Sequence, residues 1–293
     1  MVLDEGDKMK TMVHLLIRFS CLITGFTLFL SIPRLFNIRT GSIDASFENF
    51  KEKLWDTLVQ FFKNYPIETW LDKNITERYA YTMEVLILSL ALITVQGLIL
   101  AAITLIGPYK FRQFFKRVLD MVEAIPDLLV IFLFQIIVIS IYKSTGLKLL
   151  QLYGFNAYPY FIPIVVTSFL PTLYLAQFLA KVLEEEVQKE YVIYAKAKGM
   201  SLFRIYVFHM LRNTLPLYII QLRTIVWFVL SNIVLIEYMF KIKGFTIDLG
   251  RILFQPAPQV MFNFFLFAVP IILIDILIRY VAYKARGHEE VRL

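Results

Sequence analysis

Long apolar runs separated by shorter polar segments dominate the pattern along the chain. The runs cover approximately residues 12–33, 81–106, 118–142, 158–179, 215–240 and 261–283. An α-helix of about 20 apolar residues spans the roughly 30 Å hydrocarbon core of a bilayer. The pattern therefore predicts an all-α polytopic membrane protein with about six transmembrane helices.

A long polar segment, residues 34–79, separates the first apolar run from the other five. Within it, residues 47–62 alternate apolar and charged positions at helical spacing, which predicts an amphipathic surface helix. We therefore expect a cytoplasmic tail and first transmembrane helix at 1–33 and an extracytoplasmic segment at 34–79. A five-helix core is expected at 80–284, with a cytoplasmic tail at 285–293.

Basic residues gather in alternate polar segments. Residues 108–117 contain four Lys or Arg and no acid, and residues 181–213 contain six basic residues. Loops rich in Lys and Arg stay on the cytoplasmic side of a membrane. Both segments and both termini are therefore expected in the cytoplasm. This distribution explains the net charge of +7 without a nucleic-acid partner.

Composition agrees with a membrane protein and offers little catalytic chemistry. Apolar residues make up 58% of the chain and charged residues 18%, whereas soluble domains carry about 25% charged residues. The single cysteine, Cys21, excludes a disulfide within the chain, and the three histidines are scattered. The sequence holds no Gly-x-x-x-x-Gly-Lys-Ser/Thr phosphate loop. We therefore predict no enzymatic activity, no metal site and no cofactor on this chain.

The cytoplasmic segment 181–214 is the most informative part of the chain. Its first half has acids followed by lysines, which suits the dipole of a short helix. Gly199 stands where a left-handed helix cap is needed, because glycine has no Cβ to clash there. Ser201 can cap a second helix, and Thr214 and Pro216 are expected to restart a helix at the membrane. The pattern predicts a stiff helix–glycine–helix elbow; the plainest alternative is a passive connection between two spans.

This elbow resembles the EAA loop of inner-membrane permeases of ATP-binding cassette importers, most closely the peptide-permease branch. The resemblance covers about 27 positions and then, more weakly, residues 80–283. One span, an extracytoplasmic stretch and a five-span core also resemble the B-type partner of the two peptide permeases. The residues that match the branch's pattern are Glu190, Tyr191, Val192, Ala195, Lys196, Ala197, Lys198, Gly199, Ser201, Arg204, Ile205, His209, Leu211, Arg212, Asn213 and Pro216.

The resemblance implies a permease subunit in the inner (plasma) membrane of a prokaryote. Its expected partners are a second homologous permease, two ATPase subunits that carry the ATP and Mg, and an extracytoplasmic solute-binding protein. In that family the EAA loop docks into the ATPase, so nucleotide-driven closure moves the transmembrane helices. The implied coupling residues here are Glu190, Tyr191, Ala195, Lys196, Ala197, Lys198, Gly199, Ser201, Arg204 and Asn213.

Two features leave alternatives open. Acidic residues at membrane depth, among them Glu237 and Asp275, are candidate pathway or gate residues and also fit a proton- or ion-coupled carrier. Arg279 follows Asp275 by four residues and can pair with it on one helix face. The substrate is also open, since relatives carry peptides, nickel complexes or other solutes. Lys243 stands where the family usually has a proline before Gly244.

Overall fold

The fold is described from a computed structural model of the 293-residue chain. It divides into two compact units, residues 1–72 with 249–267 and residues 73–248 with 268–293, which are described separately. The structure describes residues 21, 24–25, 27–29, 32, 36–39, 42–45, 47–63, 73–122, 125–146, 158–250 and 257–285.

The first unit contains a small hairpin and the predicted surface helix. Strands β1 (Phe36–Arg39) and β2 (Ser42–Ala45) pair antiparallel, with Phe36 opposite Ala45. Helix α2 (Phe47–Lys63) confirms the amphipathic helix predicted over 47–62. The hairpin was not predicted, because four-residue strands are too short to leave a clear alternation in the sequence.

Five helices among the described residues are long and apolar enough to cross a membrane. They lie within α4 (Lys73–Ile106), α6 (Asp127–Thr145), α7 (Phe161–Glu186), the continuous helix that ends with α10 (Leu211–Met239), and α12 (Ala257–Ala285). The all-α polytopic fold is therefore confirmed. Most of the predicted first span, residues 12–33, lies outside the described residues.

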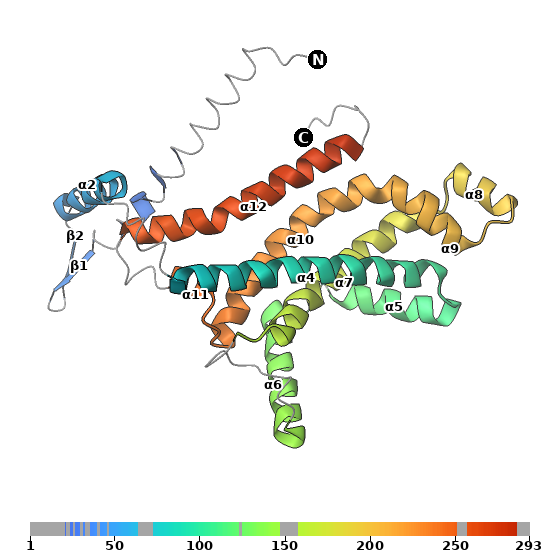
Figure 1. The fold of residues 1–293 in the computed structure, drawn as a ribbon, viewed down its shortest axis with the longest axis horizontal. Helices are drawn as coiled ribbons and strands as arrows, with labels where there is room; N and C mark the ends of the chain where they lie inside the picture. The colour runs from blue at the N-terminus through green and yellow to red at the C-terminus, as the bar shows by residue number, and fades with distance from the viewer. Residues whose placement is uncertain are drawn as a thin grey trace, which may run out of the picture. The chain divides into compact units, whose positions relative to one another are not determined.

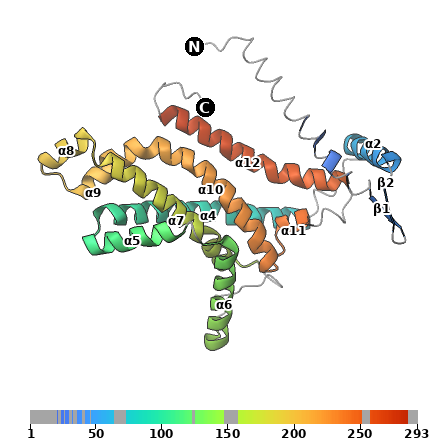
Figure 2. The same ribbon diagram turned by 180° about the vertical axis from the view of Figure 1, so that it is seen from behind.

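The second unit is built around the contact between α4 and α7, which run side by side (Figures 1 and 2). Gly97 permits this close approach, because a Cβ there would lie 2.9 Å from Cδ2 of Leu175. Tyrosine hydroxyls tie neighbouring segments to α4: Tyr218 donates to the hydroxyl of Thr94 at 3.0 Å, and Tyr81 donates to the carbonyl of Pro159 at 2.6 Å. These bonds satisfy polar groups that would be costly in an apolar interior.

The predicted third span, residues 118–142, was wrong in its bounds. Instead, α5 (Tyr109–Val122) runs back along α4, and α6 begins only at Asp127 (Figure 1). Pro126 stands just before α6 and cannot donate to a continuous helix ladder. The predicted loop at 108–117 is thus largely helical, and its Lys116 pairs with Glu184 of α7.

The elbow is helical on both sides of Gly199, as predicted. Helices α8 (Glu190–Ala197) and α9 (Leu202–Ile205) flank it at the end of the unit opposite α11 (Phe245–Gly250), as Figures 1 and 2 show. The expected restart at Thr214 was wrong. A π-helical turn, η3 (Tyr206–Met210), joins α9 directly to α10, so residues 202–239 form one helix. Pro216 lies inside this helix, where it cannot donate a backbone hydrogen bond.

Candidate functional site

The elbow begins where α7 ends and turns back into α8. On α8 the side chains of Val192 and Ala195 are buried, which fixes the helix against the rest of the unit. Gly199 follows with φ of +78°, the left-handed conformation predicted for it. Ser201 then accepts a hydrogen bond from the backbone N–H of Arg204 at 3.4 Å, which confirms the predicted cap of the second helix.

The carboxylate of Glu186 joins the three segments of the elbow. It is 4% exposed at the end of α7. It accepts from the hydroxyl of Tyr191 on α8 at 2.6 Å and from the side-chain amide of Asn213 on α10 at 3.4 Å. Lys189 Nζ pairs with its other oxygen at 2.6 Å. Charge-assisted bonds of this kind are stronger than neutral ones, so Glu186 holds α8 to both long helices.

Tyr191 remains a donor in this cluster across the physiological pH range. Partial burial, and then the hydrogen bond to Glu186, raise the pKa of its hydroxyl to about 12. The structure thus brings together two of the predicted coupling residues, Tyr191 and Asn213. Sequence reasoning missed Glu186 itself, whose only local signal was the three-residue spacing to Lys189.

The remaining predicted coupling residues lie mostly on the outside of the elbow. Ala195 is buried, and Lys198 sits with its Nζ 4.5 Å from the ring centre of Tyr194. The other predicted residues are exposed: Glu190, Lys196, Ala197, Gly199, Ser201 and Arg204. The elbow therefore has a packed side, with Val192 and Ala195, and exposed positions that include Lys196, Lys198 and Arg204.

Large apolar side chains are also exposed on the elbow. Tyr194, Phe203 and Phe208 are each about two-thirds exposed, at 63%, 63% and 66%. Ile193 is 58% exposed, and Val207 is 38% exposed. Large exposed apolar patches mark interaction sites in proteins, and these side chains come from the helical segments on both sides of Gly199.

Glu237 lies in a second buried cluster, at the opposite end of α10 from the elbow. It is 2% exposed. Its carboxylate accepts from the hydroxyl of Thr82 on α4 at 2.6 Å and from both the N–H and the hydroxyl of Thr246 on α11, at 2.9 and 2.5 Å. Thr82 also accepts from the N–H of Phe245 at 3.0 Å. The cluster fastens the segment after α10 onto α4.

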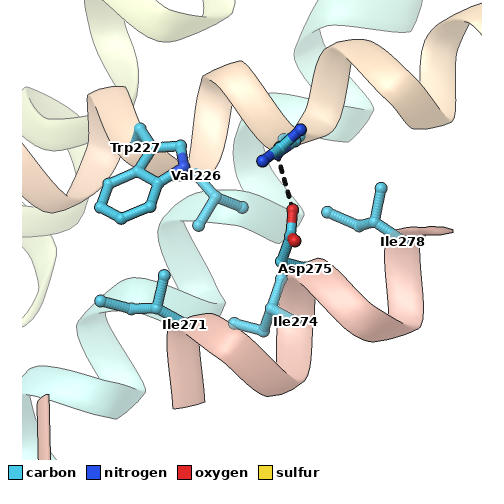
Figure 3. A pocket seen from close by; sticks show the side chains of 7 residues that line it. Val226, Trp227, Ile271, Ile274, Asp275 and Ile278 are labelled. Carbon is cyan, nitrogen blue, oxygen red and sulfur yellow. Dashed lines mark ion pairs between the residues drawn. The ribbon is translucent and has the colours of Figure 1, made fainter. Parts of the chain in front are cut away.

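Asp275 on α12 lies between two arginines. One carboxylate oxygen pairs with Nε of Arg223 on α10 at 2.7 Å, the ion pair marked by the dashed line in Figure 3. The other oxygen accepts from Nε of Arg279 at 2.9 Å. The predicted pair of Asp275 and Arg279 is confirmed, whereas Arg223 was not anticipated. The group lines a cavity of about 10 Å³ together with Trp227, which is room for about one water.

Neither acid has the surroundings expected of a proton- or cation-carrying site. Glu237 is enclosed by fixed donors, and Asp275 is occupied by two guanidinium groups. No cluster of three possible metal ligands occurs within the ranges that the structure describes.

Comparison with known proteins identifies the family of the chain. No curated protein matches the chain significantly. A family profile described as "Binding-protein-dependent transport system inner membrane component" matches residues 93–286, which is more than half of the chain and includes the elbow and the Arg223–Asp275 pair. The chain therefore belongs to the family of inner-membrane components of binding-protein-dependent transport systems.

Proposed function

We propose that this chain is the transmembrane permease subunit of a peptide importer and that segment 181–214 couples it to a separate ATPase. Family membership implies an ATPase and a solute-binding protein as partners. The finer assembly is proposed from the resemblance of the elbow. It comprises a second homologous permease, two ATPase subunits that carry the ATP and Mg, and an extracytoplasmic binding protein in a prokaryotic inner membrane.

The observation that carries the coupling role is the exposed apolar surface of the elbow. We define the elbow patch as Ile193, Tyr194, Phe203, Val207 and Phe208. The neighbouring lysines and arginine make the surroundings of the patch polar. A patch of this kind is suited to a protein partner, with aromatic side chains as the anchors.

The packing behind the elbow patch explains how a partner would move the helices. Glu186 fixes α8 to α7 and to α10 through Tyr191 and Asn213. A displacement of α8 is therefore shared with two long helices and is not absorbed in a loose loop. Alternating access needs such rigid-body movement between packed elements.

Peptides are the proposed substrate class, supported by the match over residues 190–216 to the peptide-permease branch. Nickel complexes are the second class carried by relatives of that branch. No observation in the structure favours the ion-coupled carrier over the importer, because both deep acids are held by fixed partners.

The test is affinity purification of the full chain with its partner subunits in mild detergent, followed by an ATPase assay. Phe203→Ser removes an anchor of the elbow patch, and Phe111→Ser removes an exposed phenylalanine (53% exposed) from α5 as the matched control. We expect a phosphate-loop ATPase and a second permease to co-purify with the wild-type chain and with the control. Phe203→Ser should lower the retained ATPase at least about tenfold, as for loss of a binding anchor.

A chain that purifies alone and shows no linked ATPase activity would overturn the importer. Equal retention of the ATPase by Phe203→Ser and Phe111→Ser would instead reject the elbow patch as the docking surface. Uptake assays on the assembled transporter, with a tripeptide and with a nickel chelate as competitors, then decide the substrate class.

A further inference from the structure

The exposed face of α10 differs in chemistry from that of the other spanning helices. Arg223, Trp227, Ser231, Val234 and Tyr238 are all exposed, and their spacing of three or four residues puts them on one side of the helix. We call them the α10 stripe. Polar or aromatic side chains occupy four of its five positions over most of the length of the span.

The exposed face of α12 is aliphatic by comparison. Ile272, Leu273, Ile276 and Leu277 are 53% to 60% exposed and form an aliphatic surface in its middle, and Arg279 and Tyr280 are exposed nearer its C-terminal end. Such a surface suits lipid chains. Ionisable residues at membrane depth almost always face the bundle interior or a water-filled cavity, so the α10 stripe, which contains Arg223, is less suited to lipid than the aliphatic part of α12.

Arg223 belongs to a helix that is long and apolar enough to cross a membrane. It precedes Glu237 by fourteen residues on α10, or about 21 Å at 1.5 Å per residue. Glu237 contacts Thr82, at the beginning of the apolar run of α4. Arg223 is thus near the middle of α10 (Leu211–Met239).

The two arginines around Asp275 keep unused capacity for an anion. Arg279 donates its Nε–H to one carboxylate oxygen of Asp275, and Arg223 pairs with the other oxygen through charge, with its Nε at 2.7 Å. Within the part of the chain that the structure describes, neither guanidinium group has another acceptor. The cluster has a net charge of +1, and the side chains of Arg223 and Arg279 are 47% and 56% exposed. Guanidinium groups bind carboxylates through their paired terminal N–H groups, and Asp275 holds Arg223 in a fixed orientation for this.

We propose that the α10 stripe lines the translocation pathway and that Arg223 is its binding residue for the carboxylate of the transported solute. This inference rests on the proposed function for the identity of the pathway. Asp275 and Arg279 act as positioning residues, and Trp227, one turn from Arg223, supplies an aromatic face for the rest of the solute. A solute with a free carboxylate, such as the C-terminus of a peptide, fits this chemistry.

The test measures access and local charge with two small thiol reagents. In a Cys21→Ser background, Trp227→Cys and Ser231→Cys probe the α10 stripe, and Leu273→Cys and Leu277→Cys probe the α12 surface as matched controls. The assembled transporter in membrane vesicles is treated with an anionic sulfonate methanethiosulfonate or with its cationic trimethylammonium analogue. These reagents require water but not transport, so the test is independent of the peptide assignment.

We expect both stripe cysteines to react at least about tenfold faster than the α12 controls, with the anionic reagent preferred at position 227. Adding Arg223→Gln should lower the ratio of anionic to cationic rates there at least about fivefold, since one charge within a few ångströms is lost. Asp275 still pairs with Arg279 in that variant, and an unchanged rate at Ser231→Cys for the cationic reagent reports an intact fold.

Slow reaction at both stripe positions would overturn the pathway assignment. An unchanged reagent preference after Arg223→Gln would overturn the role of Arg223. If both results hold and no peptide is transported, the peptide assignment fails while the anion site stands.

Discussion

The carboxyl group of Glu237 occupies the place where a side chain on residue 244 would begin. A Cβ built on Gly244 would overlap both the Cδ and the carboxylate oxygens of Glu237. Seven residues after Glu237, the backbone at Gly244 comes back against the Glu237 side chain on α10. Only a glycine permits this approach. The departure from the family at Lys243, which is exposed, leaves this packing intact.

Gly244→Ala should therefore destabilise the protein. Overpacking at a fully enclosed position typically costs about 1–3 kcal/mol. The measurement is the thermal unfolding midpoint of the purified chain in detergent. The double variant Gly244→Ala with Glu237→Ala should be less destabilised than the sum of the two single variants, because the overlap is then relieved. Strict additivity would show that the two residues do not compete for space.

Gly199→Pro should abolish ATP-driven transport while the protein still inserts into the membrane. Proline is fixed near φ of −65°, whereas Gly199 has φ of +78°, so the elbow cannot keep its shape. Gly199→Asn is the matched control, because asparagine tolerates the left-handed conformation. Uptake and membrane content are measured for both, and normal uptake by the proline variant would contradict the elbow as coupling element.

Glu186→Ala should loosen the elbow without removing the elbow patch. Tyr191 and Asn213 lose their common acceptor, and a typical intramolecular hydrogen bond contributes about 0.5–1.5 kcal/mol. We expect the ATPase to remain bound while transport per ATP hydrolysed falls severalfold. Glu184→Ala removes an exposed acid from the same sequence and serves as the control. The same loss in both variants would argue against a special role for Glu186.

Cysteine labelling from the two sides of the membrane tests the orientation. Lys110→Cys, at the start of α5, should react from the cytoplasmic side, and Lys143→Cys, in the last turn of α6, from the other side. Both side chains are exposed, so access depends on the membrane alone. Reversed labelling would overturn the positive-inside assignment.

Local sequence chemistry predicted the elbow well. Gly199 and Ser201 act through backbone conformation and capping, which depend on a few neighbouring residues. The same is true of Asp275 and Arg279, which share one helix face. The bounds of α5 and α6 were harder to predict. Residues 118–122, at the end of α5, and the start of α6 look like one apolar run in the sequence, although the helices break before Pro126.

Long-range partners were not predictable from such patterns. Arg223 pairs with Asp275 across 52 positions of sequence, and no local spacing connects them. Likewise the sequence does not distinguish the three consecutive glutamates at 184–186. Only the packing of α7 against α8 and α10 buries the third, Glu186. These contacts depend on which faces of the helices meet, which a single sequence does not specify.

The π-helical turn η3 determines which way the far end of its helix faces. A π turn accommodates one residue more than an α turn, so every later position is rotated by about 100° relative to an unbroken α-helix. Arg223 and Trp227 lie downstream of Tyr206–Met210. Were this turn to tighten into regular α-helix during the transport cycle, the α10 stripe would swing away from its present direction while the elbow stayed docked. The extra residue thus allows the part of the helix after η3 to face either of two directions. A change from π to α winding would rotate that part about the helix axis without changing the tilt of the helix.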